Sequence, residues 1–166
     1  PSDLIEVYTG GAPYVDKAKF SDESFEYYKI DKNFIPEMYK SRRICNSLDN
    51  LIFDPDYKTE MFDVFFKNQD ERKTCRARLQ KEFDFVEITT SMTNNLEIML
   101  KGINKGSALR ELCEVAGYNI KDVTVVGDSK NDLTAFSTEA RKYAVSNACN
   151  EIKGHRAVGR RTVFQQ

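Results

Sequence analysis

Hydrophobic and polar positions follow two different patterns along the chain, and the change comes near Gly102. Beyond this glycine the pattern predicts helices and strands in alternation: a helix at Ser107–Ala116, a strand at Val123–Val126, a helix at Asn131–Ala140 and a strand at Tyr143–Val145. Such alternation is typical of a parallel sheet covered by helices. Val123–Val126 is the most hydrophobic β-branched run in the chain, which predicts a strand buried on both faces.

Before Gly102 the chain is more polar and the predicted elements follow a mixed order. The apolar run Leu4–Tyr8 predicts a strand of the core that ends in a tight turn. From residue 12 to residue 101 the pattern predicts an α+β insert: strands at Phe25–Ile30, Phe62–Lys67, Phe85–Met92 and Leu96–Leu100, and helices from Pro36 to about Ser47 and from Asn68 or Asp70 to near Phe83. We therefore expect an α/β fold with a partial Rossmann-like parallel-sheet core, residues 1–11 and 102–166, and an inserted α+β domain, residues 12–101.

The composition is that of an ordinary globular chain, because 166 residues with 40% hydrophobic content can bury a core. With a formal net charge of -1, the chain has no overall positive field that would attract nucleic acid. We expect the basic stretches Arg72–Lys81 and Lys153–Arg161 to be solvated. No apolar run approaches the roughly 20 residues that cross a bilayer, so we expect no membrane contact. The cysteines lie far apart and His155 is the single histidine, so we expect no zinc site. We expect the thiols to be reduced and the protein to be cytoplasmic.

Polar residues gather directly after the predicted strand Val123–Val126. In α/β sheets, ligands bind beyond the carboxyl ends of the strands, where Asp128 lies, and Asp132 follows it on the first turn of a helix. Two carboxylates near a helix N-terminus suit Mg²⁺ or the waters around it, while Ser129 and Asn131 can hydrogen-bond to phosphate oxygens. Taken alone, the pattern is better explained by an N-cap of the helix.

A second element, Gly102-Ile103-Asn104-Lys105-Gly106, precedes this loop by one helix and one strand. LEIMLKGINKGSAL and VTVVGDSKNDLTAF, followed by Asn147-Ala148 and Lys153, resemble the Cof-type, cap-bearing branch of the haloacid dehalogenase superfamily. The resemblance covers Leu96–Lys153 closely and the remaining residues more loosely. Two motifs in the expected order favour a phosphate site over a simple helix cap.

The resemblance implies a Mg²⁺-dependent phosphatase that acts on a small phosphorylated metabolite such as a sugar phosphate. A phosphoryl group stays negatively charged throughout transfer, so a lysine ammonium and Mg²⁺ around it stabilise the transition state. The implied roles are a catalytic lysine at Lys105, metal ligands at Asp128 and Asp132, and phosphate contacts at Ser129 and Asn131.

The family's nucleophile belongs to an N-terminal D-x-D-G-T motif, and the 166 residues contain none. The TGGA of Thr9–Ala12 resembles the family's exit from its third core strand into a C2-type cap, here residues 12–101. The one D-x-D, Asp54-Pro55-Asp56, lies within that cap and lacks the following Gly-Thr, so we interpret it as a chance acidic turn. We expect part of a phosphatase without its nucleophile. The alternative is a catalytically inactive binding or interaction module of the same superfamily.

A third interpretation is the phosphorylation domain of a cation pump, which also carries a G-D-x-x-N-D loop. The strands before Lys105 and the missing membrane segments favour the soluble branch. In the family's sheet the nucleophile strand lies between the strands expected at Leu4–Tyr8 and Val123–Val126. Because unpaired strand edges associate readily, we expect a homo-oligomer or a complementing chain to fill this gap.

The interpretation of Asp54-Pro55-Asp56 as an acidic turn can be tested directly. The purified 166-residue chain, supplied with Mg²⁺, should release little or no phosphate from p-nitrophenyl phosphate, because no nucleophile motif is present. The measurement is inorganic phosphate released against a blank without protein. Turnover that the substitution Asp54→Asn abolishes would make Asp54 the nucleophile and the interpretation wrong.

Overall fold

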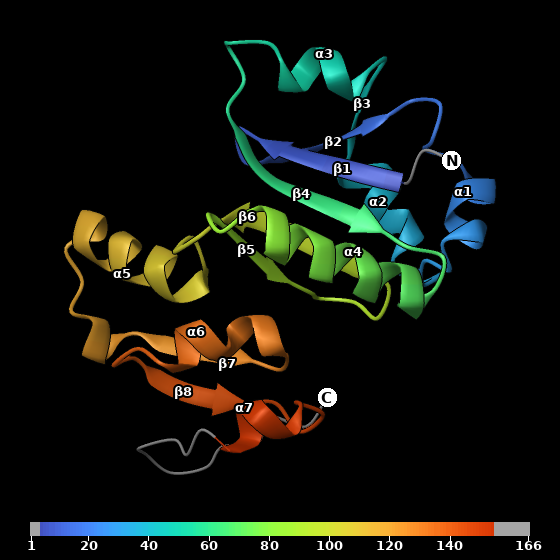
Figure 1. Ribbon diagram of the computed structural model, residues 1–166. Helices are drawn as coiled ribbons and strands as arrows, with labels where there is room; N and C mark the ends of the chain where they lie inside the picture. Colours follow the sequence, from blue (N-terminus) through green and yellow to red (C-terminus); the bar gives the residue numbers. More distant parts are fainter. Residues whose placement is uncertain (1–3, 155–166) are drawn as a thin grey trace. The chain divides into compact units, whose positions relative to one another are not determined.

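The computed structural model describes residues 4–154 of the chain. The chain divides into a first unit, residues 1–100, and a second unit, residues 101–166 (Figure 1). The division after Leu100 lies close to residue 102, where the sequence pattern changes. All four cysteines are free, and no helix in the described part of the chain is long and apolar enough to span a membrane. His155 and the basic tail beyond Gly154 lie outside the described residues.

The first unit is built on a six-stranded sheet with strand order β3-β2-β1-β4-β6-β5. Neighbouring strands are antiparallel except β2 and β3, which are parallel. The strands are β1 Leu4–Thr9, β2 Ala12–Asp16, β3 Arg43–Cys45, β4 Thr59–Phe65, β5 Val86–Thr89 and β6 Asn95–Leu100. The helices are α1 Asp22–Tyr27, α2 Ile35–Ser41, α3 Leu48–Ile52 and α4 Gln69–Glu82.

The assignment of residues 1–11 to the parallel core is wrong. Strand β1 pairs antiparallel with β2 on one side and with β4 on the other, so it is an inner strand of the first unit's sheet. Gly10 and Gly11, with φ of 57° and 70°, form the turn that returns the chain beside β1. Two successive residues with positive φ favour a tight hairpin. Thr9–Ala12 therefore belongs to a hairpin of this sheet and not to an exit from the core.

Two further local predictions in the first unit are wrong. The segment expected as a strand at residues 25–30 has its first half in helix α1 and its second half in the turn that follows; Ser21 accepts a hydrogen bond from the backbone N–H of Ser24 and caps the helix. The helix expected from Pro36 to about Ser47 ends at Ser41, and β3 follows it. The structure confirms the predicted positions of β4, α4, β5 and β6, and Asn68 caps α4.

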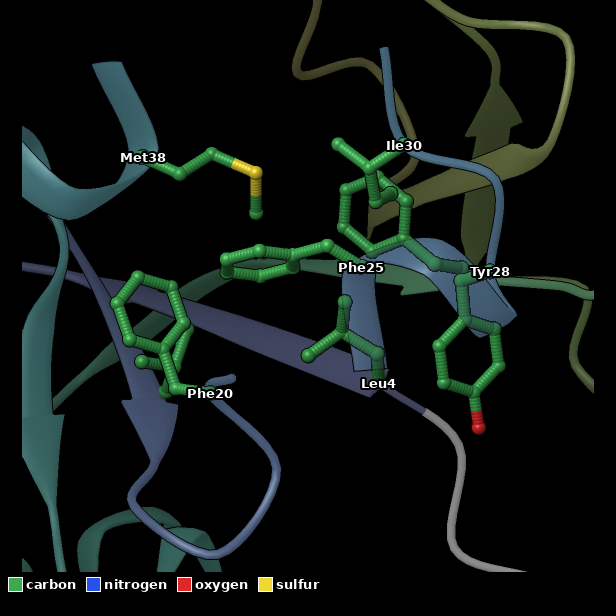
Figure 2. Close-up of a cluster of buried hydrophobic side chains, with 8 residues drawn as sticks. Leu4, Phe20, Phe25, Tyr28, Ile30 and Met38 are labelled. Atoms are coloured by element: carbon green, nitrogen blue, oxygen red, sulfur yellow. The ribbon is translucent and has the colours of Figure 1, made fainter. Parts of the chain in front are cut away.

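Aromatic and aliphatic side chains fill a core in the first unit (Figure 2). Phe25 lies near its centre and is fully buried, and its ring meets the ring of Phe20 edge to face with centroids 5.1 Å apart. Leu4 from β1 and Met38 from α2 contribute to the same cluster. Burial of Phe25 in this cluster favours the helical conformation of its segment over a strand.

Carboxylates from three adjacent strands form a row across the sheet of the first unit. The strand registers place Glu6 opposite Asp63 and Asp63 opposite Glu97. Arg42 binds Glu6 through two hydrogen bonds of 2.9 Å, and Asn95 donates to Asp63 at 2.9 Å. Like charges directly opposite one another are unfavourable. The pKa of Asp63 is raised to about 8, first by burial and then by Glu6.

The second unit carries two parallel strands, β7 Thr124–Gly127 and β8 Arg141–Ala144. Its helices are α5 Lys105–Ala116, α6 Leu133–Phe136 and α7 Asn150–Gly154, with short 3₁₀ turns at Ile120–Asp122 and Lys130–Asp132. Gly117, with φ of 71°, ends α5 as the sequence predicts. Together the two units confirm the expected α/β class, with a partial parallel-sheet core and a separate α+β unit.

Strand β7 is not buried on both faces, contrary to the prediction. Phe136, Ala148 and Ile152 form a small core against the face that carries Val125. Val126, on the opposite face, is 56% exposed. Among the described residues β7 pairs with β8 alone. One face and one edge of β7 are therefore uncovered by these residues, although its β-branched sequence is typical of a strand buried on both faces.

The carboxylate row gives a prediction on stability. An unfolded aspartate has a pKa near 3.8, so at intermediate pH the folded state holds a proton on Asp63 that the unfolded state lacks. Stability is therefore greatest at the acidic end of this window and is lost as pH rises towards 8. From about pH 5 upwards the free energy of unfolding should fall by about 1 kcal/mol per pH unit.

Asp63→Asn should remove most of this slope, as measured by urea denaturation followed by circular dichroism at several pH values. The matched control is Asp70→Asn, because the Asp70 side chain is 95% exposed and its removal should leave the slope unchanged. An Asp63→Asn variant with the slope of the unchanged chain would show that Asp63 does not hold the proton.

Candidate functional site

The polar loop after β7 is held in place through its main chain. The carbonyl of Gly127 accepts a hydrogen bond from the N–H of Val145 at 3.3 Å, and the carbonyl of Asp128 accepts one from the N–H of Cys149 at 2.7 Å. The loop is therefore tied to the segment that follows β8. Sequence analysis missed Val145 and Cys149, because a residue that acts through its backbone leaves no pattern of side chains.

Asp132, the last residue of the 3₁₀ turn, is 6% exposed. Its Oδ2 accepts hydrogen bonds from the backbone N–H groups of Asp128 at 2.9 Å and Ser129 at 3.3 Å. Its Oδ1 accepts a hydrogen bond from the Nζ of Lys105 at 2.5 Å. One carboxylate thus joins the loop to the first residue of α5, and the structure brings together two residues that the sequence places 27 positions apart.

The charge of Asp132 is stabilised by its donors. Burial by itself raises the pKa of a carboxyl group, but the hydrogen bond from Lys105 and the two backbone N–H donors outweigh it and hold the pKa of Asp132 below its ordinary value. At neutral pH the group is therefore a carboxylate that faces an ammonium.

The position of Lys105 follows from the cap of α5. The side chain of Asn104 accepts hydrogen bonds from the N–H groups of Gly106 and Ser107, and the hydroxyl of Ser107 accepts one from the N–H of Asn104. This capping box fixes the first turn of the helix. The Lys105 side chain is 54% exposed, so its ammonium is held by Asp132 and still accessible to an anionic ligand.

The two predicted metal ligands occupy different surroundings. Both oxygens of Asp132 already accept hydrogen bonds, whereas Asp128 is exposed and no hydrogen bond to its carboxylate is found among residues 4–154. Mg²⁺ is often bound by one or two carboxylates together with waters and substrate phosphates. Asp128 fits such a ligand, while Asp132 fits a group that holds the loop and Lys105. Within the described residues no three acidic, cysteine or histidine side chains gather as a complete metal site.

The remaining loop side chains interact with one another or with a neighbouring helix. The hydroxyl of Ser129 donates to Oδ1 of Asn131 at 2.7 Å, which leaves the amide nitrogen of Asn131 as the donor suited to a phosphate oxygen. Lys130 forms an ion pair of 2.5 Å with Glu151 of α7, a contact that the sequence pattern did not indicate.

The D-x-D segment does not lie at the end of a strand, as the loop after β7 does. Asp54 follows helix α3 rather than a strand, and its side chain accepts a hydrogen bond from the N–H of Asp56 at 2.9 Å. This is the geometry of a local acidic turn. The segment belongs to the first unit, whereas Lys105 and Asp132 belong to the second.

Comparisons with known proteins agree with one another. Residues 5–158 match the family model described as haloacid dehalogenase-like hydrolase. The chain is 38% identical over 127 residues to a phosphoglycolate phosphatase of Methanobrevibacter smithii, covering 75% of this chain and 54% of that protein. It is 31% identical over 98 residues to the Bacillus subtilis 5-amino-6-(5-phospho-D-ribitylamino)uracil phosphatase YcsE, covering 59% of this chain and 39% of that protein.

Solved structures show the same fold. A haloacid dehalogenase-like hydrolase from B. subtilis gives a TM-score of 0.67 at 19% identity and covers 92% of this chain and 58% of that one. A sugar phosphatase of subclass IIB, BT4131, gives a TM-score of 0.65 at 14% identity and covers 94% of this chain and 54% of that one. The chain spans between about a third and about half of the length of the first curated relatives that it matches.

The close packing at Gly127 gives a prediction on the loop. A Cβ at this position would lie 2.7 Å from Oδ2 of Asp132 and 2.8 Å from the ring of Phe136. Gly127→Ala should therefore lower the free energy of unfolding by about 1–3 kcal/mol, the usual effect of overpacking. The measurement is urea denaturation followed by circular dichroism. The control is Gly154→Ala, where a Cβ meets none of the described residues within 4 Å. Equal stability of the two variants would contradict the packing described here.

Proposed function

Because the chain belongs to the haloacid dehalogenase-like hydrolase family, we propose that it supplies the lysine and the metal-binding loop of a Mg²⁺-dependent phosphomonoester hydrolase. The observation that carries the proposal is the ion pair between Lys105 and the buried Asp132, beside an exposed carboxylate at Asp128. This arrangement presents a fixed positive charge and a metal ligand from neighbouring segments. Both are needed where a phosphoryl group is bound and transferred.

Lys105 provides the positive charge in this proposal. Its ammonium has three donor hydrogens, of which Asp132 uses one, so the others can bind phosphoryl oxygens. An ammonium that is already oriented costs no reorganisation when negative charge shifts during transfer. Asp132 therefore assists indirectly, since it holds Lys105 and the loop without touching the phosphoryl group.

The loop provides the other contacts. Asp128 is the residue that would hold Mg²⁺. The amide nitrogen of Asn131 can donate to a phosphoryl oxygen, and the hydroxyl of Ser129 orients that amide through its hydrogen bond to Oδ1. Bound Mg²⁺ supplies charge neutralisation and orientation of the phosphoryl group. One carboxylate holds Mg²⁺ weakly, so further oxygen ligands are required from elsewhere in the enzyme.

The attacking carboxylate is not among these groups in our proposal. The 166 residues contain no D-x-D-G-T motif, and their single D-x-D is a turn in the other unit. We propose that residues outside these 166 supply the nucleophile and the missing metal ligands, either from the same protein or from a complementing chain or second copy. The exposed side chain of Val126 and the second edge of β7 suit such a contact.

The proposed substrate is a small phosphorylated metabolite, with sugar phosphates as the first class to examine. The names of similar proteins include a phosphoglycolate phosphatase and a sugar phosphatase, which share a small phosphomonoester as the reacting group. We propose a cytoplasmic location, since four free cysteines suit a reducing compartment.

The test extends the protein upstream through its own coding sequence. We expect that sequence to encode D-x-D-G-T in frame, and the extended protein to hydrolyse p-nitrophenyl phosphate with Mg²⁺. In the extended protein Lys105→Ala should lower kcat by about 10²- to 10³-fold, the usual effect of removing one transition-state donor. The measurement is steady-state phosphate release.

The matched control is Lys130→Ala, which changes a lysine of the loop after β7 that is paired with Glu151 and should keep kcat within about twofold. Equal loss in both variants would show that Lys105 has no special role. A start codon directly before the codon of Pro1, without the motif, together with an inactive chain, would favour the inactive binding module instead.

A further inference from the structure

Helices α5 and α6 meet at a backbone contact beside the ion pair of Lys105 and Asp132. Gly106, the second residue of α5, is buried against Thr134 of α6. A Cβ on Gly106 would lie 2.3 Å from the carbonyl oxygen of Thr134 and 2.7 Å from its carbonyl carbon. No side chain fits there, so the two helices are in contact through their main chains at this point.

A hydrogen bond accompanies this contact. The N–H of Gly106 lies 3.2 Å from Oγ1 of Thr134 and 3.1 Å from Oδ1 of Asn104, so it is shared between the helix cap and the neighbouring helix. Gly106 directly follows Lys105, and Thr134 lies two positions after Asp132. The contact therefore joins the backbone segments that carry the two partners of the ion pair.

We propose that Thr134 is a positioning residue for Lys105, acting through the N–H of Gly106; the inference rests on the role proposed above for Lys105. A lysine side chain has four flexible carbons, and a half-exposed ion pair fixes its direction only weakly. The backbone from which it extends must therefore be held with respect to Asp132. This backbone is held by the hydrogen bond from the N–H of Gly106 to the hydroxyl of Thr134 and by the close contact that the absence of a side chain at Gly106 allows.

The experiment measures how readily an acetylating reagent modifies each lysine of the purified 166-residue chain, with mass spectrometry to assign the sites. Lys105 must leave Asp132 before its amine can react, so its acetylation rate reports the ion pair and requires no turnover. Thr134→Val keeps the shape of the side chain and removes the acceptor, whereas Thr134→Ser keeps the acceptor. Asp132→Asn shows the rate of an unpaired Lys105.

Thr134→Val should raise the acetylation rate of Lys105 by about twofold to tenfold, the effect of one lost hydrogen bond on an equilibrium. Thr134→Ser should restore a rate close to that of the unchanged chain. Lys130, which is paired with Glu151 in the same unit, serves as the internal reference and should keep its rate. Gly106→Ala, which forces the two helices apart, should raise the rate of Lys105 further.

Three results would overturn the proposal. An unchanged Lys105 rate in Thr134→Val, with a raised rate in Asp132→Asn, would show that Thr134 does not position the lysine. A parallel rise at Lys105 and Lys130 would indicate general loosening of the unit. An unchanged rate in Asp132→Asn would mean that no ion pair exists to be positioned. Because the assay does not depend on phosphatase activity, loss of the proposed function alone would appear only in the turnover assay.

Discussion

The buried carboxylate of Asp132 holds the candidate site together. A buried charge is unfavourable unless it is paired and hydrogen-bonded. Here Lys105 donates to one oxygen, and the backbone N–H groups of Asp128 and Ser129 donate to the other. The loop conformation and the position of the lysine therefore depend on the same group. With both oxygens of Asp132 occupied in this way, Asp128 is the exposed carboxylate of the loop, the one that our proposal assigns to Mg²⁺.

The first unit also contains a buried carboxyl group, but its pKa shifts in the opposite direction. Asp63 is also a buried aspartate, but it lies between Glu6 and Glu97 in the strand registers, and the nearby Arg42 binds Glu6. The pKa of Asp63 rises, because burial and then the charge of Glu6 outweigh its single amide donor. The pKa of Asp132 falls, because an ammonium and two N–H donors outweigh its burial. The donors around a buried carboxyl group, rather than burial alone, decide its charge.

Helices could be predicted where capping residues next to them mark their ends. Helix α4 begins after its cap Asn68, and α5 ends at Gly117 in the left-handed conformation, both as the sequence indicates. The failures lie where distant residues decide. The segment at residues 25–30 looks like a strand, but its first half is helical with Phe25 in an aromatic core. Strand β1 looks like a parallel core strand but lies between two antiparallel neighbours.

The sequence by itself determined which side chains line the loop after β7, because they are consecutive residues at the end of a strand. It also indicated Lys105, through a second motif at the expected separation. Only the tertiary structure decided that Asp132 is buried and hydrogen-bonded while Asp128 is exposed, because the donors to Asp132 come from main-chain N–H groups and from another helix. It alone brought Thr134 against Gly106, a contact of two backbones that no spacing of side chains encodes.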